Sequence, residues 1–382
     1  MGPSYPTRAV AVNGPMRILG FMTGTSLDAV DMAVLETDGE TIQAFGPSGE
    51  RKLREATRDL LLVATEIARG WPRERPEPEI FAEAAQVVAD EHFHAAESFL
   101  AEHGLSWSDF DLLGVHGQTV LHERPTPERI GRTVQLLDAE RLARLTGRPV
   151  AFDFRTADVA AGGQGAPLAP IYHDARARAS GLAAPVAALN IGGVANITLV
   201  DEDGTLLAFD TGPGNGMIDL MLQERGLGRF DENGRLAAAG RVDEAILERF
   251  LASAYFAGPA PKSLDRYDFP LDLVEPLSAE DAAATLVAFT AEAVVKAFEH
   301  GARPSALIVC GGGRHNPQIM KVLTERCPVP VKTAEDYGWR GDAIEAEAFA
   351  YLAARTARGL PISFPGTTGV ARAMTGGRIV RP

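Results

Sequence analysis

Residues 18–35 read ILGFMTGTSLDAVDMAVL, and the rest of the fold can be worked out from this stretch. Two apolar runs, 18–22 and 30–35, flank a short segment of glycine, serine, threonine and aspartate, which is typical of two strands joined by a polar turn. The second half of the chain opens in the same way, because apolar residues 186–189 and 194–200 flank a turn that reads Asn-Ile-Gly-Gly. This weak internal duplication predicts two related α/β domains.

Helices and strands alternate after each hairpin. Apolar residues recur at helical spacing in 81–103, where His92 lies on the apolar face and is expected to be a buried structural histidine. We therefore expect mixed sheets flanked by helices, with ligands bound in the cleft between the two domains. Further helices are predicted at 139–146, within 216–301, at 317–326 and at 343–358, and short strands at 112–115, 149–154, 205–209, 306–310 and 329–333.

The domain ranges follow from this pattern. A flexible extension is predicted at 1–15, a first domain at 16–184 and a second domain at 185–382. The C-terminal tail of the second domain is a candidate to pack back on the first.

Composition limits the possible partners and the compartment. The chain has 382 residues, an apolar fraction of 46% and a formal net charge of −14, so it can build large cores but repels nucleic-acid backbones and anionic membranes. The two cysteines, Cys310 and Cys327, form no disulfide framework, and no apolar run approaches the ~18 residues of a membrane span. We expect a cytoplasmic protein with no nucleic acid and no membrane among its partners.

Three glycine-rich turns, each at the end of an apolar strand, are candidates for binding a phosphate group or a flat ring. The turn at 23–28 offers backbone N–H groups and hydroxyls to phosphate oxygens. The turn at 209–215 places the carboxylate of Asp210 beside a second such turn, as phosphoryl transfer requires. The turn at 309–313 lets a flat ring or a phosphate lie on the backbone, whereas Cys310 itself is expected to be a core residue. The alternatives are ordinary hairpin turns, with Asp210 capping its own turn.

Other nucleotide-binding and hydrolase patterns are missing from the sequence. It contains no G-x-x-x-x-G-K-[ST], no H-E-x-x-H, and no G-x-G-x-x-G that opens a helix after the first strand. Three glycine turns spread over a duplicated chain instead resemble the actin-like ATPase superfamily. That superfamily, whose domains are ribonuclease H-like, uses two hairpin turns on the phosphates and a later glycine pair under the adenosine.

Further motifs narrow the resemblance to one family. Blocks at 24–31, 116–119, 133–135, 153–155, 158–168, 189–193, 209–215, 261–263, 310–313 and 345–350 resemble, in order, those of the anhydro-N-acetylmuramic acid kinases of bacterial cell-wall recycling. The resemblance implies a kinase that adds water at C1 of a 1,6-anhydro sugar, opens the bridge and phosphorylates the freed O6 with ATP and Mg²⁺. Departures from the family pattern occur at Ala29, at 136–138 and at 264–267, where other residues are usual.

The resemblance also implies roles for individual residues. Asp210 matches the catalytic base. Arg155 is a candidate partner for the lactyl carboxylate or, alternatively, forms a structural salt bridge with Asp153 or Asp158. Glu345 matches a sugar contact, and its alternative is an acid on a helix surface. The implied ATP-binding residues are Gly24, Thr25, Ser26, Leu27, Asp28, Ala29, Val30, Asp31, Gly212, Gly214, Asn215, Gly311, Gly312 and Gly313, and the implied sugar-binding residues are His116, Gln118, Thr119, Arg155 and Glu345.

Two other functions stay open from the sequence. One is a kinase of the same fold for another anhydrosugar, such as 1,6-anhydroglucose. The other is an actin- or chaperone-like ATP switch without a sugar substrate. The sequence does not identify the magnesium ligands, and a homodimer is plausible only by the family resemblance.

Overall fold

The first hairpin forms as predicted. The computed structural model describes residues 14–126, 128–264 and 267–382, so most of the predicted N-terminal extension lies outside the described residues. Strand β1 (Met16–Thr23) pairs antiparallel with β2 (Ala29–Thr37), in a register that runs from Met16 opposite Thr37 to Thr23 opposite Val30.

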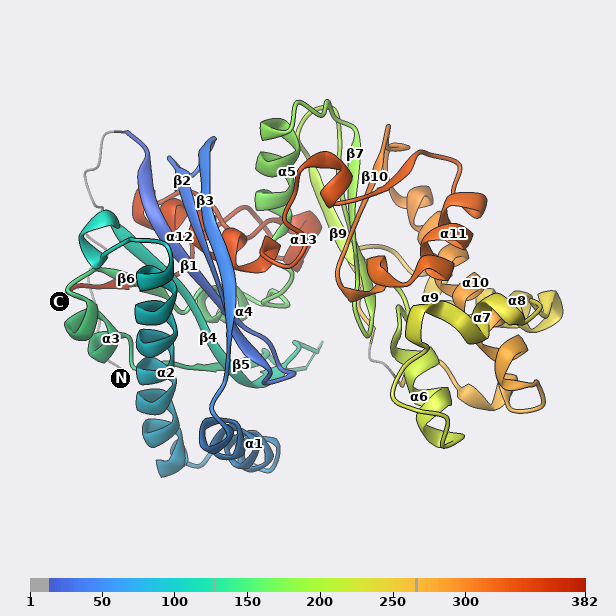
Figure 1. Ribbon diagram of the computed structural model, residues 1–382, viewed down its shortest axis with the longest axis horizontal. Coiled ribbons are helices and arrows are strands. Elements are labelled where there is room, and N and C mark those ends of the chain that lie inside the picture. The colour runs from blue at the N-terminus through green and yellow to red at the C-terminus, as the bar shows by residue number, and fades with distance from the viewer. Residues whose placement is uncertain (1–13, 127, 265–266) are drawn as a thin grey trace. The chain divides into compact units, whose positions relative to one another are not determined.

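The chain forms two units (Figure 1). Unit 1 comprises Met1–Ala179 and Ala343–Pro382, and unit 2 comprises Ser180–Asp342. Unit 1 contains β1, β2, β3 (Ile42–Lys52), α1 (Glu55–Arg69), α2 (Glu79–Glu102), β4 (Leu112–Glu123), β5 (Arg132–Leu136), α3 (Ala139–Thr146), β6 (Val150–Phe152), α4 (Thr156–Ala160), α5 (Pro170–Ala179), α12 (Ile344–Arg358), α13 (Pro365–Thr368) and β12 (Arg378–Val380). Unit 2 contains β7 (Val186–Ile191), β8 (Ala195–Val200), β9 (Leu206–Gly212), α6 (Gly216–Glu224), α7 (Arg235–Ala239), α8 (Glu244–Leu251), α9 (Ala254–Ala257), α10 (Ala279–Ala297), β10 (Leu307–Cys310), α11 (Pro317–Arg326) and β11 (Val331–Thr333).

The two sheets share one strand order. In unit 1 the order is β12-β6-β4-β1-β2-β3, with β5 paired to β4, and in unit 2 it is β11-β10-β7-β8-β9. In each sheet the first three strands of the unit pair antiparallel in turn. Two later strands, β4 and β6 in unit 1 and β10 and β11 in unit 2, run parallel to the first strand. Strands β1, β2, β3, β4 and β6 therefore correspond to β7, β8, β9, β10 and β11. The predicted duplication and the predicted mixed sheets are confirmed.

Helix α12 packs on the sheet of unit 1 because two glycines make room for it. Gly20 in β1 and Gly114 in β4 are paired across the parallel strands. A Cβ atom at Gly20 would lie 2.0 Å from the carbonyl oxygen of Ala346, and one at Gly114 would lie 2.4 Å from that of Phe349. The sequence analysis places 343–382 in the second domain, whereas this close packing makes α12 part of unit 1. The boundary between the halves also lies at 179/180 rather than at 184/185.

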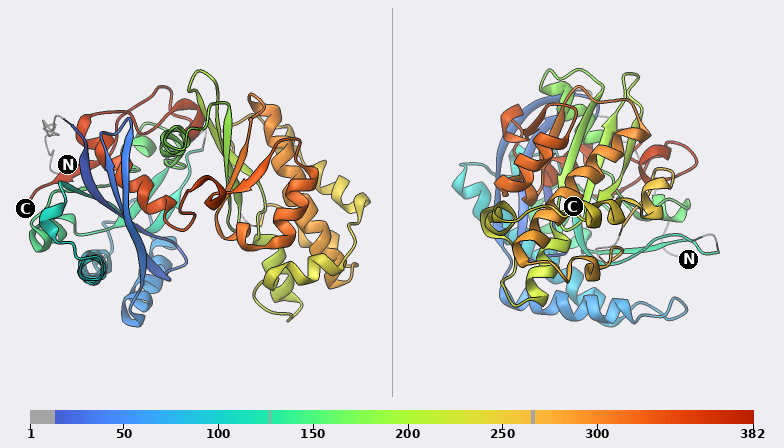
Figure 2. Two further views of the ribbon diagram at one scale, coloured as in Figure 1. Left: turned by 45° about the horizontal axis from the view of Figure 1, so that its top comes forward. Right: turned by 90° about the vertical axis from the view of Figure 1, so that its right-hand side faces the viewer.

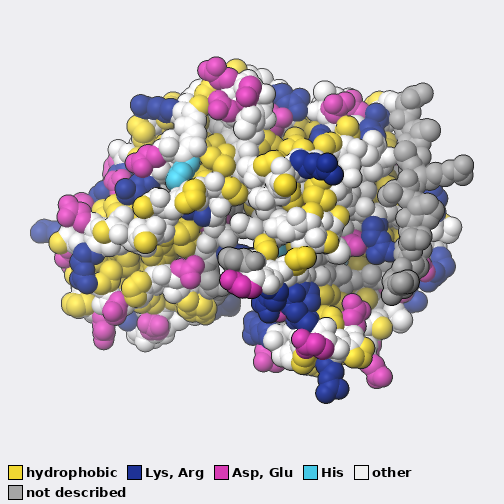
Figure 3. Space-filling model, turned by 180° about the vertical axis from the view of Figure 1, so that it is seen from behind, with side chains coloured by type: hydrophobic (Ala, Val, Ile, Leu, Met, Phe, Trp, Pro, Cys, Tyr) yellow, Lys and Arg dark blue, Asp and Glu magenta, His cyan; other side chains and the backbone are white. Residues whose placement is uncertain are grey.

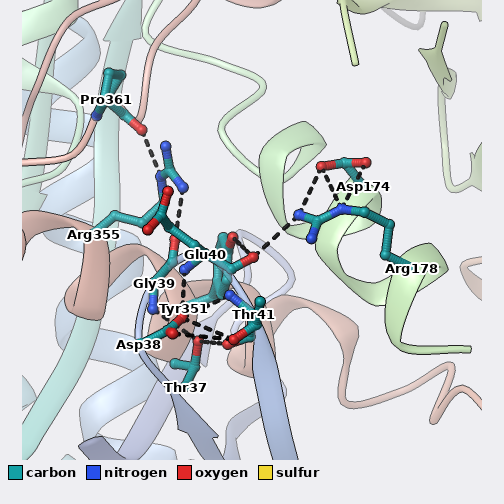
Figure 4. Close-up of polar contacts among 10 residues, drawn as sticks. All are labelled: Thr37, Asp38, Gly39, Glu40, Thr41, Asp174, Arg178, Tyr351, Arg355 and Pro361. Atoms are coloured by element: carbon teal, nitrogen blue, oxygen red, sulfur yellow. Dashed lines mark hydrogen bonds and ion pairs between the residues drawn. The ribbon is translucent and has the colours of Figure 1, made fainter. Parts of the chain in front are cut away.

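Polar contacts hold the turn between β2 and β3 against the helices of unit 1 (Figure 4). Arg355 of α12 donates from Nη1 to the carbonyl of Gly39 over 2.6 Å. The carbonyl of Glu40 accepts from Arg178 Nη2 at the end of α5 and from the hydroxyl of Tyr351 in α12. Two helices that are distant in sequence, α5 and α12, are thus tied to one tight turn.

Each unit has its own hydrophobic core. In unit 1 the alternate residues Leu19 and Phe21 face α2, where His92 is buried and bonds through Nδ1 to the carbonyl of Val88, as predicted. In unit 2 the helices from α6 to α11 gather on one side of the sheet (Figures 1 and 2). Cys310 is buried in its strand, also as predicted.

Candidate functional site

The first glycine turn is held by the neighbouring strand β4. The amide of Gln118 donates to the carbonyl of Gly24 over 3.3 Å, and the hydroxyl of Thr23 donates to the carbonyl of Gly117 over 3.1 Å. Leu27 has a positive φ of 57° and turns its side chain into the core. The turn is therefore fixed by β4 and by the buried side chain of Leu27. Its other side chains, those of Thr25, Ser26 and Asp28, are exposed.

Three further predicted nucleotide residues belong to strand β2. Val30 is fully buried in the core of unit 1, so its side chain is unavailable to a ligand. Ala29 and Asp31 are half-buried at the beginning of the strand. Of the block 24–31, the exposed turn is thus the part that can meet a phosphate.

Two predicted sugar residues meet in unit 1. Arg155, which follows β6, donates from Nε to Nε2 of His116 in β4 over 3.1 Å, and from Nη1 to the carbonyl of Gly165 over 2.7 Å. Because arginine only donates, Nε2 of His116 is the acceptor and the proton of the neutral ring resides on Nδ1. Burial, and then the charge of Arg155, hold the pKa of His116 well below its ordinary value. The ring is therefore neutral at physiological pH.

The alternative structural salt bridge of Arg155 does not occur among the described residues. Asp153 contacts Arg378, and the carboxylate of Asp158 accepts from the amide of Gly165 and from the hydroxyl of Thr368. Burial lowers the pKa of Arg155 to about 10, so the guanidinium remains charged at neutral pH. Nη2 of Arg155 has no hydrogen-bond partner within the described part of the chain, and it is the nitrogen best placed to bind an anion.

Glu345 joins this group from the first turn of α12. The ring of Phe349, one turn further along α12, lies 4.7 Å from that of His116. Desolvation raises the pKa of Glu345, although its side chain keeps solvent exposure, and the charge of Arg155 opposes that rise. Thr119, in contrast, is bound by Gln135 across the β4–β5 pair, and it lies on the same strand as His116. All five predicted sugar residues belong to unit 1.

The second glycine turn carries Asp210 at the end of β9. The amide of Asp210 donates to the carbonyl of Lys262 over 3.0 Å, and the amide of Leu264 donates to Oδ2 of Asp210 over 2.7 Å. The following residue, Thr211, donates to the carbonyl of Ala195. The carboxylate of Asp210 is therefore held by a donor from outside its own turn.

The third glycine turn lies beside the second in unit 2. The amide of Asn215 donates to the carbonyl of Gly192, and the side-chain amide of Asn215 donates to the carbonyl of Ile191. Gly311 follows β10 against the same segment, since a Cβ atom there would lie 2.2 Å from Oδ1 of Asn190. The structure thus brings the segments 190–193, 212–216 and 311–313 together.

A cavity of about 370 Å³ opens beside these two turns. Its lining includes Asn215 from the second turn and Gly312 from the third. Phe230 also lines it and is 62% exposed, which is unusual for a phenylalanine in a loop. Phe230 is not among the site residues predicted from the sequence, although a lone aromatic residue in the polar loop 226–234 could have indicated a ligand contact. The full lining is Asn215, Ile218, Asp219, Phe230, Asp231, Glu232, Asn233, Gly312, His315 and Asn316.

Similarity to known proteins shows the family to which this chain belongs. Each unit carries a mixed sheet of the same strand order, with a glycine turn at the end of a strand. The chain belongs to the anhydro-N-acetylmuramic acid kinase family, whose model matches residues 16–382.

Similar proteins span nearly the whole chain. It is 82% identical to the anhydro-N-acetylmuramic acid kinase of Caulobacter vibrioides over 366 residues, which cover 96% of this chain and 99% of that protein. It is 72% identical to the enzyme of the same name from Phenylobacterium zucineum, over 96% of this chain and all of that protein. Among solved structures, component A of the (R)-2-hydroxyglutaryl-CoA dehydratase of Acidaminococcus fermentans matches with a TM-score of 0.46 at 14% identity, over 90% of this chain and 99% of that one.

The described residues contain neither a membrane-spanning helix nor a cluster of metal ligands. No helix among them is both long and apolar enough to cross a bilayer. No group of three or more His, Cys, Asp or Glu side chains in the same residues is arranged to hold a metal ion.

Proposed function

We propose that this protein uses ATP and water to open 1,6-anhydro-N-acetylmuramic acid and to phosphorylate its O6, which gives N-acetylmuramic acid 6-phosphate and ADP. The observation that carries this proposal is family membership over residues 16–382, at 82% identity to an enzyme of that name. The reaction belongs to the recycling of peptidoglycan. It distinguishes this protein from kinases that act on a free sugar hydroxyl.

The chemistry explains why one carboxylate base is sufficient. The bridging O6 carries no proton, so the base acts on the water that attacks C1. We assign this role to Asp210, which takes the proton from water as the C1–O bond forms and the C1–O6 bond breaks. The electron pair released onto O6 then attacks the γ-phosphorus, and ADP leaves. A well-placed base is commonly worth ~10²–10⁴-fold in rate.

We assign sugar recognition to unit 1. The guanidinium of Arg155 suits the lactyl carboxylate, because Nη2 has no partner among the described residues while Nε and Nη1 are fixed by His116 and Gly165. The exposed carboxylate of Glu345 offers an acceptor to the sugar hydroxyls and amide, while the buried ring of His116 positions Arg155. Gln118 and Thr119 extend this polar surface along β4.

We assign ATP binding to the three glycine turns and the cavity in unit 2. The exposed turn 24–28 and the turn 212–215 offer hydroxyl and backbone N–H groups to the phosphates. The cavity of about 370 Å³ is large enough for an adenosine, and Phe230 offers an aromatic face to the adenine ring. Gly311 and Gly313 complete the adenosine turn.

Magnesium fits this chemistry without a dedicated protein cage. Mg²⁺ is usually held by substrate phosphates, water and one or two carboxylates, so a cluster of protein ligands is not required. Asp28 in the exposed first turn is the protein carboxylate we propose for it. When bound, the ion would neutralise charge on the phosphates.

The proposed partners are therefore small molecules. On the face drawn in Figure 3, basic side chains are interspersed with acidic and hydrophobic ones, apart from one group near the bottom of the view. This distribution and the net charge of −14 support a protein that does not bind nucleic acid. A homodimer and a cytoplasmic location stay predictions.

Isotope-labelled water tests the assignment of the base. In oxygen-18 water the product should carry the label at C1 and none on the phosphate, and Asp210→Asn should lose at least 100-fold in rate. Label on the phosphate would indicate hydrolysis of ATP by an actin-like switch and would contradict the proposal. Equal turnover of 1,6-anhydroglucose would instead point to the alternative sugar kinase.

A further inference from the structure

We propose that Lys262 is a positioning residue for the base Asp210: its ammonium group binds backbone carbonyls at the end of α9 and so fixes the segment that holds the carboxylate. This inference rests on the proposed function, because it assumes that Asp210 is the base. Lys262 belongs to the block 261–263, and nothing in the proposed chemistry uses its side chain.

The ammonium group lies among acceptors of the chain itself. Nζ of Lys262 is 3.0 Å from the carbonyl oxygen of Tyr255, 3.3 Å from that of Phe256 and 3.0 Å from that of Gly258. It is also 3.1 Å from Nε2 of His300. These carbonyls come from α9 and from its C-cap residue Gly258, and that of Tyr255 also accepts from the amide of Gly258. Four acceptors surround the three protons of one ammonium group, which leaves none for a phosphate.

The state of His300 agrees with this arrangement. Burial, and then the neighbouring Lys262, lower the pKa of His300, so Nε2 of the neutral ring can accept a hydrogen bond from the ammonium group. Glu299 is the acidic group that acts on both side chains, and it stabilises their charged forms. The aromatic ring of Tyr255 lies 4.8 Å from Nζ, a distance at which a cation is attracted to the ring.

The segment that Lys262 fixes touches Asp210 at three atoms. The carbonyl of Lys262 accepts from the amide of Asp210 over 3.0 Å, and the hydroxyl of Tyr255 donates to the carbonyl of Asp210. The amide of Leu264 donates to Oδ2 of Asp210 over 2.7 Å. One end of this segment is thus bound by the side chain of Lys262, and both ends bind Asp210. Releasing Nζ would loosen the donor that orients the carboxylate.

The position of the base affects the rate more than the affinity. A displacement of about 1 Å in a reacting group can cost about 100-fold in rate. We therefore expect Lys262→Met to lower kcat by about 10- to 100-fold. KM for ATP and for the sugar should stay within about twofold, since the ammonium group of Lys262 is bound by acceptors of the chain itself. A lysine that bound a phosphate would do the opposite and raise KM for ATP.

Steady-state kinetics of the full chain test this inference. The variants are Lys262→Met, Lys262→Gln, Lys262→Ala and the control Lys321→Met, an exposed lysine on α11. The expected result is a loss of kcat in the three Lys262 variants, partial rescue of Lys262→Ala by added butylamine, and no change in the control. Hydrogen exchange should be faster in 255–264 of the folded variants. Lys262→Gln keeps two N–H donors and serves if the Met variant does not fold.

The outcomes separate the two proposals. A raised KM for ATP with an unchanged kcat would overturn the positioning role in favour of a phosphate contact. Unchanged kinetics and unchanged hydrogen exchange in all three variants would overturn it as well. Failure of the proposed function looks different, because the unmodified protein would then not turn over the anhydro sugar at all.

Discussion

Replacement of Arg155 tests how the sugar is recognised. In the structure, Nε and Nη1 of Arg155 are held by His116 and Gly165, and we propose that the guanidinium binds the lactyl carboxylate through Nη2. Arg155→Met removes the charge and keeps much of the side-chain volume. The assay compares kcat/KM for 1,6-anhydro-N-acetylmuramic acid with that for 1,6-anhydro-N-acetylglucosamine, which has no lactyl group.

The expected magnitude follows from the environment of Arg155. Removing one partner of a desolvated charge pair costs about 2–5 kcal/mol, and the half-buried position of Arg155 favours the lower end. A loss of about 2–3 kcal/mol corresponds to about 30- to 150-fold in kcat/KM for the lactyl sugar. The sugar without the lactyl group should lose about threefold or less, through the lost hydrogen bonds to His116 and Gly165.

The comparison of the two sugars makes this prediction refutable. An equal loss for both would show that Arg155 supports the fold or the base and not the carboxylate. Arg155→Lys is the matched variant, because it keeps the charge but not the fork, and it should lose less than Arg155→Met on the lactyl sugar. Melting temperatures of both variants show whether the fold has been retained.

Three further predictions concern other parts of the structure. Phe230→Ala should raise KM for ATP by about 10-fold, since stacking on a base is worth about 1–3 kcal/mol. KM for ATP should stay near the unmodified value in Phe230→Tyr, and KM for the sugar should not change in either variant. Steady-state kinetics with either substrate varied will show this. Gly20→Val should strongly lower the free energy of unfolding or prevent folding, because its Cβ would lie 2.0 Å from the carbonyl oxygen of Ala346. Overpacking costs about 1–3 kcal/mol or more, and urea unfolding measures this loss of stability. Burial lowers the pKa of His92 and of His173 to about 4, so the unfolded chain binds their protons first as the pH falls below 6.5. The free energy of unfolding should therefore fall by about 3 kcal/mol for each histidine by pH 4. His92→Gln should reduce this dependence of the unfolding free energy on pH, which unfolding curves measured across the range will show.

Much of the fold could be predicted because its signals are local. Alternating apolar runs and glycine turns identified both hairpins, and their repetition identified the duplication. The placement of α12 could not be predicted in this way. It depends on Gly20 and Gly114 lying side by side, and that pairing exists only after two distant strands join in parallel.

In the candidate site, too, the features with a local sequence pattern could be predicted and the long-range contacts could not. The turns at 23–28, 209–215 and 309–313 were predictable, because a strand followed by glycine and a polar residue is a local pattern. The bond between Arg155 and His116 joins two strands, and the carbonyls around Lys262 have no sequence signature at all, since any residue supplies a carbonyl. The family resemblance provided roles for Asp210 and for the sugar residues that the spacing alone did not.

The most direct test of the central claim is ADP release by the purified protein with Mg-ATP and a panel of sugars. We predict stimulation by 1,6-anhydro-N-acetylmuramic acid, little by 1,6-anhydroglucose, none by N-acetylmuramic acid, and loss of the stimulated rate in Asp210→Asn. ADP release that no sugar increases would contradict the proposed kinase, and a stimulated rate that persists in Asp210→Asn would contradict the assignment of the base.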